Sequence, residues 1–463
     1  MLPVSRRRRA YAALILGTIL SVLDASIANI ALPTIGRELH SSPAATVWVT
    51  NAFQLAVTAA VFTFGSLGQS RGPTTIWRIG IVTFTLGSLL CALSRSFEFL
   101  VLARIVQGLG AAAIMSLAPA LIRDVYPRSR LGHAFGLNAM YTGVATAAGP
   151  TAGGLLLAVL PWQWLFAINV PVAFVIVFLA RGAVPEIPGT GAPLDVRSAA
   201  TSAVGFGLLV YGLDGIARGD APLLIAAELL AGGGAFAWFV RRQFVLPHPL
   251  IALDLFRMPR FAVASQASFT GWAAWSIGVI TLPFFLQLDY GMSPLQSGLL
   301  MTSWPIATAV VAPIAGRFAD RYAVGLVATI GLVIFALALS MYAYAALHPS
   351  IVLLVSAGIV GGAGFGIFQT PNNREIMGSG PPEKGGSVAA IFASLRVAGQ
   401  TFGASLAAIV FATFAPSATA HFAPDKMHGA VLAALGVACL LSFAATFVSA
   451  QRAYRDGFHY HAP

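Results

Sequence analysis

One acidic residue, Asp24, stands alone within the first long apolar stretch of the chain, residues 11–33. If this stretch is a membrane helix rising about 1.5 Å per residue, Asp24 lies about 20 Å from its start and about 13 Å from its end. A carboxylate at that depth costs at least about 2.5–3.5 kcal/mol on insertion scales, so it must face protein or water. An acid in such a place usually has a function, and a structural ion pair is the alternative.

The rest of the chain supplies the helices that would position this acid. Of its 463 residues, 57% are hydrophobic and only 9% are charged. Soluble domains carry about 25% charged residues, so the composition predicts a polytopic membrane protein. The apolar stretches are too long and uniform for the alternating strands of a β-barrel, which favours helices. We expect fourteen of them, beginning near Tyr11, Thr46, Ile76, Phe97, Leu131, Trp164, Val196, Pro222, Phe261, Pro294, Leu326, Ile351, Ser387 and Gly429.

The net charge of +11 would suit nucleic-acid binding, but the positions of the basic residues indicate an orientation signal instead. If the N-terminus is cytoplasmic, most of the 27 Lys and Arg residues, including the run at residues 6–9, fall on the cytoplasmic side. This positive-inside pattern predicts that both termini lie in the cytoplasm. We expect the membrane to be the bacterial inner membrane. The exceptions are Arg37, Arg95, Arg218 and Lys426 outside, and Arg104 and Arg396 within helices.

Two similar short segments indicate an internal repeat. Residues 65–71 follow the second predicted helix and residues 316–322 follow the tenth. If helices nine to fourteen repeat helices one to six in parallel, helices seven and eight are an inserted pair between Pro/Gly-rich linkers. The predicted all-α architecture is a six-helix bundle at 1–183, a linker with the inserted pair at 184–259, a second six-helix bundle at 260–452 and a cytoplasmic tail at 453–463.

Five motifs follow one another at the expected helices. Residues 23–33 carry the first-helix acid, and residues 104–112 read R-x-x-Q-G-x-G-A-A in the fourth helix. Residues 149–154 read G-P-x-x-G-G, residues 162–171 open the sixth helix, and residues 371–373 continue the match in the second half. Together these motifs resemble the major facilitator superfamily, and specifically its fourteen-helix drug:proton antiporter family. The resemblance spans almost the whole chain.

The resemblance implies the major facilitator fold and export driven by protons that the first-helix acid carries. It also implies that the turn after the second helix latches the cytoplasmic gate through charge pairs. Here that turn departs from the family pattern, because Gln69 stands in place of its acid. The equivalent turn of the second half keeps Asp320 and Arg321, so we expect the better preserved latch there.

Arg104 is expected close to Asp24. It lies about 10 Å from the outer face on an inward-running helix, and Asp24 lies about 13 Å from the same face. Arg104 would hold the carboxylate ionised while burial opposes its charge, and a coupling acid needs these two influences to alternate. A fixed salt bridge between helices one and four is the alternative. Gln107 and Gly108 are assigned to gating, and Glu228 in helix eight is the rival proton carrier.

A stripe of small residues marks the fifth predicted helix. Ala145, Gly149 and Gly153 recur every four residues, a spacing that lets a neighbouring helix approach closely. Pro150 removes a backbone hydrogen bond within the stripe. With Gly154, we expect these residues to form a surface on which the halves rock, in preference to a substrate site.

Large aromatic and polar side chains fall on helices that the repeat would place around a central cavity. Aromatic rings bind flat apolar molecules by stacking and contact area, and packing or lipid contact is the alternative for each ring. Arg396 either faces the cavity or binds backbone carbonyls. The cavity candidates are Asn51, Tyr141, Phe269, Trp272, Trp275, Trp304 and Arg396.

The sequence holds no nucleotide-binding loop, no metalloprotease motif and no catalytic triad in a soluble context, so it does not predict an enzyme. We expect a proton-coupled exporter of small amphipathic compounds that works by rocking of two halves, with no cofactor and no metal. A dedicated metabolite exporter and a transport-inactive sensor or scaffold are the alternatives. The expected partners are substrates, protons and the lipid bilayer, not nucleic acid. We expect a monomer. Association with a periplasmic adaptor and an outer-membrane channel is the alternative that the sequence does not decide.

Acids deep in the predicted spans are few, with Asp24 and Glu228 the clear cases, and Arg104 and Arg396 balance them. A dicationic substrate would need more than one accessible carboxylate, because desolvating two positive charges without partners is costly. We therefore predict monovalent cationic, neutral or weakly anionic lipophilic substrates in preference to dications.

Overall fold

The computed structural model describes residues 3–127, 130–191, 195–246, 251–379, 385–414 and 424–455, and every regular element in these ranges is helical. Thirteen helices are long and apolar enough to cross a membrane, and the shorter apolar helix Trp164–Ala180 completes the expected fourteen. The all-helical prediction is confirmed for this part of the chain. The spans are α1 (Val4–Glu38), α2 with α3 (Pro43–Thr46, Trp48–Arg71), α4 (Pro73–Ala92), α5 (Phe97–Val125), α6 (Leu131–Val159), α7 with α8 (Trp164–Ala167, Asn169–Ala180), α9 (Val196–Arg218), α10 (Pro222–Val245), α11 with the π-helical turn η3 (Pro259–Phe284, Phe285–Asp289), α12 with α13 (Pro294–Met301, Ser303–Ala319), α14 (Val324–Leu347), α15 (Ile351–Ser379), α16 (Gly385–Phe414) and α17 (Pro424–Arg455).

Local sequence sets several helix boundaries. Ser42, Ser96 and Ser293 each accept a hydrogen bond from a backbone N–H three residues ahead, which caps α2, α5 and α12. Ser293 forms a full capping box with Gln296. At a helix C-terminus, Gly219 ends α9 with a φ of 73°, a left-handed conformation that glycine adopts without steric cost. Short polar turns therefore separate the long apolar helices.

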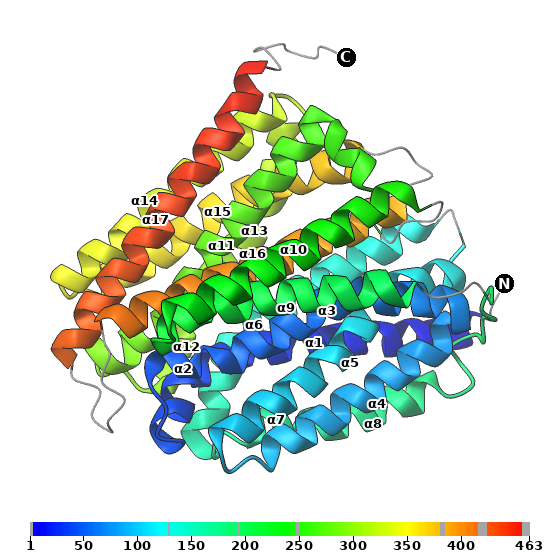
Figure 1. Ribbon diagram of the computed structural model, residues 1–463, viewed down its shortest axis with the longest axis horizontal. Helices are drawn as coiled ribbons and strands as arrows, with labels where there is room; N and C mark the ends of the chain where they lie inside the picture. The colour runs from blue at the N-terminus through cyan, green and yellow to red at the C-terminus, as the bar shows by residue number, and fades with distance from the viewer. Residues whose placement is uncertain are drawn as a thin grey trace.

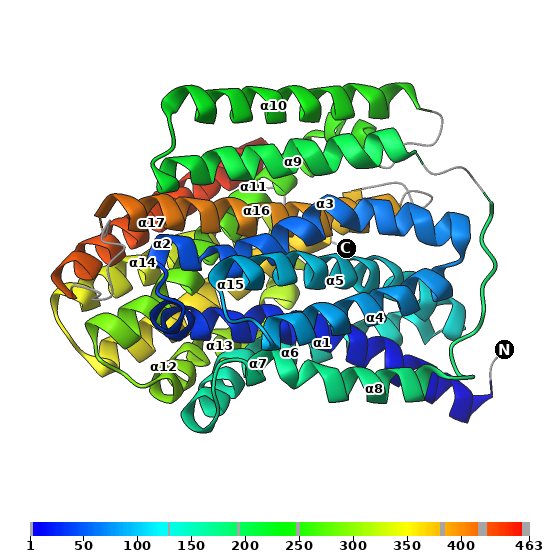
Figure 2. The same cartoon turned by 60° about the horizontal axis from the view of Figure 1, so that its bottom comes forward.

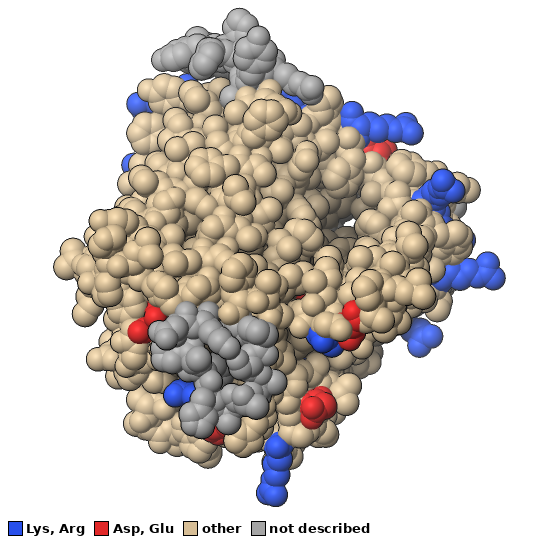
Figure 3. All heavy atoms as spheres, turned by 60° about the vertical axis from the view of Figure 1, so that its left-hand side comes forward, with Lys and Arg blue, Asp and Glu red and all other residues tan. Residues whose placement is uncertain are grey.

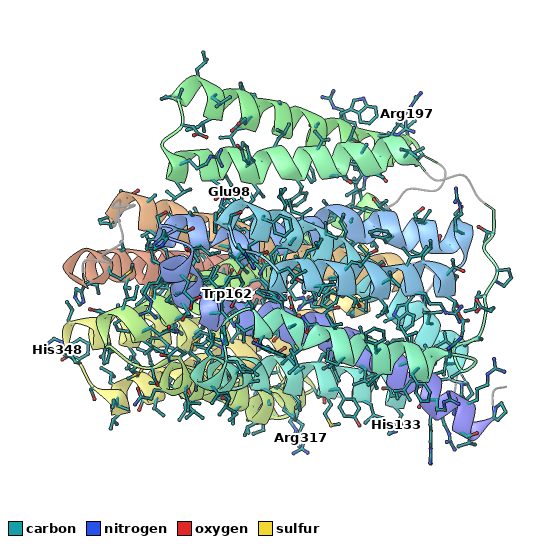
Figure 4. All side chains as sticks on the ribbon, turned by 90° about the horizontal axis from the view of Figure 1, so that it is seen from below. Glu98, His133, Trp162, Arg197, Arg317 and His348 are labelled. Atoms are coloured by element: carbon teal, nitrogen blue, oxygen red, sulfur yellow. The ribbon has the colours of Figure 1, made fainter. Side chains whose placement is uncertain are left out.

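The helices of the two halves converge toward the end of the molecule where α2 and α12 lie, and they diverge toward the end where the N-terminus lies (Figure 1). We call these the gate end and the terminal end. Because successive spans alternate in direction, His348 after α14 lies at the gate end and Arg197 at the start of α9 lies at the terminal end (Figure 4).

The predicted inserted pair forms a layer of its own. α9 and α10 lie side by side, α9 packs against α3 of the first half and α16 of the second, and α10 is outermost (Figure 2). Asp195, just before α9, accepts a hydrogen bond from Arg242 of α10 at 3.0 Å. Burial alone would raise the pKa of Asp195, but the bonds from Arg242 and Ser198 hold this pKa below its usual value. The ion pair thus fastens α9 to α10 at the terminal end.

The outer surface is apolar where a bilayer would touch it. Leu223 and Leu230 of α10 and Phe174 of α8 are 83%, 76% and 70% exposed. A broad area of the molecular surface carries no charged side chain, and Lys, Arg, Asp and Glu gather toward its margins (Figure 3). An apolar surface of this extent is unfavourable in water and suits a hydrocarbon environment. The chain is a multi-pass membrane protein.

Some predictions on domain organisation stay predictions. The boundaries at residues 183, 259 and 452 follow from the proposed repeat. The loop at residues 415–423 and the tail from residue 456 onward lie outside the described residues.

Candidate functional site

Asp24 lies on α1 with only 2% of its surface exposed. Its Oδ2 accepts a hydrogen bond from Nη1 of Arg104 on α5 at 2.5 Å, and the arginine side chain is fully buried. The structure therefore brings together Asp24 and Arg104, which the helix rise predicted to lie at similar depths in the membrane. This pair joins the first and fourth membrane spans.

Two amide side chains complete the shell around the carboxylate. Gln107 and Asn169 each donate to Oδ1 of Asp24, at 2.8 and 2.7 Å. Both also donate to the hydroxyl of Ser88 on α4, at 2.7 and 3.1 Å, and Gln107 Oε1 accepts from Arg104 at 2.6 Å. All three groups bound to Asp24 are donors, so this geometry fits the ionised carboxylate. Gln107, which we assigned to gating, contacts the acid directly.

Close helix packing fixes the arginine. Arg104 Nε donates to the carbonyl oxygen of Val49 at 2.8 Å, and the guanidinium lies 4.3 Å from the ring centroid of Phe53. Gly108 allows α3 this near approach, because a Cβ at Gly108 would lie 2.5 Å from the carbonyl oxygen of Phe53. The R-x-x-Q-G motif thus positions the buried ion pair.

Asn169 and Ser88 were not among the predicted site residues. Asn169 stands inside the sixth-helix motif, and its signal was a lone amide in an apolar span. Ser88 gives a weaker signal, since serine is common in membrane helices.

We predicted Asp24 and Glu228 as the clear acids within the spans and did not include a third one, Asp214. Asp214 on α9 is fully buried and faces Asn51 and Ser405. Neither of its carboxylate oxygens makes a hydrogen bond in the described part of the chain. Glu228, the predicted rival of Asp24, is half-buried on α10 near Gly212 of α9.

Hydrogen bonds between the two halves gather at the gate end. The hydroxyls of Thr151 on α6 and Thr302, between α12 and α13, lie 2.5 Å apart. Gln287 in η3 donates to the carbonyl oxygen of Ile30 on α1 at 2.9 Å. Asn51, a predicted cavity residue, is fully buried and donates to Ser405 of α16 at 3.2 Å. The molecule is therefore closed at the gate end, while its halves diverge at the terminal end.

The small residues of α6 face two different neighbours. Gly149 and Gly153 face α1 of the same half, where added Cβ atoms would lie 2.2 Å from Ser26 Oγ and 2.5 Å from the nearest Ile30 side-chain atom. Gly154 instead faces α12 of the other half. Of these three glycines, only Gly154 lies at the contact between the halves where we expected a rocking surface, while Gly149 and Gly153 serve packing within the first half.

Between α6 and α12 the two backbones touch directly. A Cβ at Gly154 would lie 2.6 Å from the carbonyl oxygen of Pro294, and a Cβ at Gly298 would lie 2.3 Å from that of Pro150. Such distances are far below normal van der Waals separation, so only glycine permits this closure.

We expect Gly298→Ala to weaken the closed gate, because its new methyl group would meet the Pro150 carbonyl oxygen, which is backbone and cannot rotate away. Spin labels at the exposed positions Val159 and Leu299 would report the separation of α6 and α12 by pulsed electron resonance. The variant should shift the distance distribution toward longer values. Gly233→Ala on α10, where nothing lies within 4 Å, is the matched control. Identical distributions for Gly298→Ala and wild type would contradict this reading of the gate.

The two predicted latch turns are engaged within their own halves. Asp320 forms an ion pair with Arg374 of α15, and Arg321 is exposed. In the first half, the Gln69 carbonyl oxygen accepts from the Thr190 backbone N–H at 2.9 Å in the linker before α9. These contacts are compatible with a latch that is open in the present conformation.

Two predicted cavity residues, Trp272 and Trp275, form part of one aromatic cluster, and Phe269 lies one turn away in a separate ring pair. The Trp272 ring lies 5.2 Å from that of Trp275 and 4.9 Å from that of Phe365 on α15, centroid to centroid. Phe269, one turn earlier on α11, contacts Phe402 of α16 at 5.6 Å. The cluster lines the junction of α11, α15 and α16.

The remaining candidates lie apart from this cluster. Trp304 packs on Phe335 and Tyr342 of α14, at 5.4 and 6.4 Å. Tyr141 is 40% exposed on α6 in the other half. Arg396 does join the cluster, because its guanidinium lies 5.7 Å from the Trp272 ring centroid. The choice for Arg396 between facing a cavity and binding backbone carbonyls stays a prediction.

In the described part of the chain, thirteen long apolar helices and one shorter one surround a buried ion pair, which defines a polytopic membrane protein. The chain belongs to the Major Facilitator Superfamily, which it matches over residues 14–404 and 263–457. Within that superfamily, its relatives support the drug:proton antiporter family.

Several characterised and uncharacterised proteins resemble the chain along most of its length. It is 40% identical over 441 residues to the uncharacterized transporter YebQ of Escherichia coli, covering 95% of this chain and 96% of that one. It is 28% identical to the riboflavin transporter RibZ of Clostridioides difficile, covering 82% and 83%. It is 29% identical to the multidrug resistance protein Stp of Mycobacterium tuberculosis, covering 90% and 79%.

Solved structures share the fold at low identity. A bacterial homologue of the human lysosomal transporter Spinster, in an inward-facing and unoccupied conformation, superposes with a TM-score of 0.67 at 16% identity, covering 97% of this chain and 99% of that one. A peptide transporter in complex with sulfate gives a TM-score of 0.70 at 14% identity, covering 96% and 95%. The major facilitator fold is thereby confirmed.

Proposed function

We propose that this protein is a proton-coupled secondary active exporter of small amphipathic compounds. The observation that carries the proposal is the buried Asp24, held by Arg104, Gln107 and Asn169 in a molecule closed at its gate end. An acid in this ionised state is what an antiporter holds after it has released its proton.

The basic residues indicate how the molecule is oriented in the membrane. Arg6 and Arg9, at the start of α1, bond to backbone carbonyls of the α8–α9 linker region at the terminal end. By the positive-inside rule we assign this end to the cytoplasm, and the bacterial inner membrane is part of the same proposal. The present conformation then faces inward, with the gate closed toward the outside.

The proposed cycle alternates the partners of Asp24. In the outward-facing state a proton neutralises the carboxylate and weakens its bond to Arg104. The halves then rock about the α6–α12 contact, the proton leaves toward the cytoplasm, and the ionised acid pairs again with Arg104. Substrate binds in this inward-facing state and is carried to the outside. There it leaves, and the next proton binds Asp24.

The relatives support the chemical range of the substrate. Stp and MdtD carry the name of multidrug resistance proteins, which favours broad specificity for amphipathic compounds. RibZ is named as a riboflavin transporter, which favours the second candidate, a dedicated exporter of one metabolite. Both candidates share the same energy source and the same Asp24 site.

Inverted membrane vesicles test the energy source. With a membrane potential of 100 mV, one elementary charge supplies about 2.3 kcal/mol, so we expect accumulation of about fiftyfold for one proton exchanged against a neutral probe. Radiolabelled 2-naphthamide is a suitable neutral amphipathic probe. An uncoupler should collapse its accumulation to the level of vesicles without the protein. Accumulation that survives the uncoupler would overturn proton coupling.

A further inference from the structure

Two hydrogen-bond donors in the aromatic cluster have no acceptor. Arg396, half-buried on α16, makes no hydrogen bond or ion pair with any described residue, and its guanidinium lies against the Trp272 ring. The indole Nε1 of Trp272 is buried and also lacks an acceptor within the described ranges. Trp272 is only 6% exposed, so its N–H is not simply open to bulk water.

The position of these donors matches a transport site. Arg396 lies about 16 Å into α16 and Trp272 about 20 Å into α11, both counted from the terminal ends, which places them near the middle of the bilayer. The gate contacts through Thr302 and Ser405 lie farther toward the opposite side. A molecule that enters from the terminal end would meet the donors before it reaches the closed gate.

The charge of this region is positive. Asp24 and Arg104 neutralise each other in the first half. In the described spans of the second half, the acids Asp289, Glu375 and Asp425 lie near helix ends. The buried Asp214 of α9 faces Ser405, which is nine residues farther along α16 than Arg396 and closer to the gate end. A guanidinium without a counter-charge inside a membrane protein is costly, and an anionic ligand would remove that cost.

The aromatic rings give the ligand its shape. Trp275 and Phe365 are stacked at 28° with centroids 6.2 Å apart, and Trp272 stands edge-on to both. Phe365 is buried and holds Trp275 in place, and a flat ring gains stacking area against the partly exposed Trp275 ring. Aromatic faces also attract cations, but here Arg396 already lies over the Trp272 face and would repel a second positive charge.

We propose that Arg396 and the Trp272 indole N–H form a binding site for planar aromatic anions, such as aryl carboxylates or sulfonates. This inference rests on the proposed function and narrows the substrate range predicted from the sequence to its anionic end. The anionic group accepts hydrogen bonds from Arg396 and Trp272, and the ring stacks against the half-buried Trp275. Arg396 is then a specificity-determining residue of the second half.

Direct binding to the purified protein tests the site without transport. The probes are 2-naphthoate, 2-naphthamide and 2-naphthylmethylammonium, which share one ring system and differ in charge. Since a hydrogen bond to a charged group contributes about 1.5–3 kcal/mol, we expect 2-naphthoate to bind at least about tenfold more tightly than the ammonium probe. Scintillation proximity with radiolabelled probes measures the affinities.

Variants test which residues cause the tighter binding of the anionic probe. Arg396→Gln should bring the anion and cation affinities within about twofold of each other, and Arg396→Lys should keep part of the difference, because it keeps the charge. Trp272→Phe keeps a ring but removes the N–H, and it should weaken 2-naphthoate more than 2-naphthamide. Arg317→Gln, at an exposed position of α13 in the same half, is the matched control and should bind like wild type (Figure 4). Thermal unfolding of each variant confirms that it is folded.

The outcomes separate this inference from the proposed function. Equal binding of the three probes to wild type, or an unchanged anion preference in folded Arg396→Gln, would overturn the anion site even if transport remained sensitive to an uncoupler. Anion-selective binding that depends on Arg396, in a protein whose transport ignores the uncoupler, would support the site and overturn proton coupling.

Discussion

Asp24→Asn is expected to abolish uphill export while leaving the protein folded and able to exchange substrate downhill. Asparagine keeps the shape of the protonated acid but cannot release a proton, so the cycle loses its coupling step. Accumulation in inverted vesicles should fall from about fiftyfold to the equilibrium value of one. Counterflow, in which unlabelled substrate inside drives entry of labelled substrate, should persist, because it needs no net proton movement.

Two acids elsewhere in the spans provide controls for this prediction. Glu228 is half-buried on the outermost helix α10, remote from the Asp24 shell, so Glu228→Gln should keep most of the accumulation. Asp214→Asn removes a buried acid at the gate end and tests whether any buried carboxylate would give the same loss. If Glu228→Gln abolished accumulation and Asp24→Asn did not, the proton site would be misassigned.

Depth in the membrane could be predicted from the sequence, because a membrane helix has a fixed rise and must cross a slab of fixed thickness. This is why Asp24 and Arg104 could be expected to meet despite lying on different spans, and the structure shows that they do. The fold class followed from the same constraint, since only helices satisfy their own backbone groups in lipid.

The direction in which a side chain points around its helix could not be predicted in the same way. Trp304 and Trp272 carry the same ring, yet Trp304 packs on α14 inside the second half while Trp272 meets Arg396. Asn51 and Asn169 are both amides in apolar spans, yet one bonds to Ser405 across the gate and the other to Asp24. The rotation of a membrane helix about its axis depends on which other helices pack against it, and a single sequence does not show which helices these are.

Asp214 was missed for a related reason. It lies four residues before the end of α9, close to Arg218 and Asp220, where acids are usually exposed. The structure buries it because α9 packs against both halves, a contact that no local pattern encodes.

Arg104→Gln is expected to be more damaging to stability than Asp24→Asn. It leaves an ionised carboxylate inside the protein with only two amide donors, and breaking a buried ion pair from one side costs about 3–5 kcal/mol. The phenyl ring of Phe53 and the carbonyl of Val49 would also lose the group packed against them. We expect a lower midpoint of thermal unfolding in detergent and no accumulation of probe in vesicles.

The double variant Asp24→Asn/Arg104→Gln decides whether the loss comes from the unpaired charge or from the lost shape. If an uncompensated carboxylate causes the instability, removing it should restore much of the unfolding midpoint, and the double variant should be more stable than Arg104→Gln alone. Transport against a gradient should stay absent in both, because neither retains a working acid and its counter-charge. A double variant as unstable as Arg104→Gln would instead mean that the packing of the guanidinium between Phe53 and Phe166, 4.3 and 5.4 Å from their ring centroids, holds α5 in place. The pair would then serve structure first, and the proton would have to be carried elsewhere.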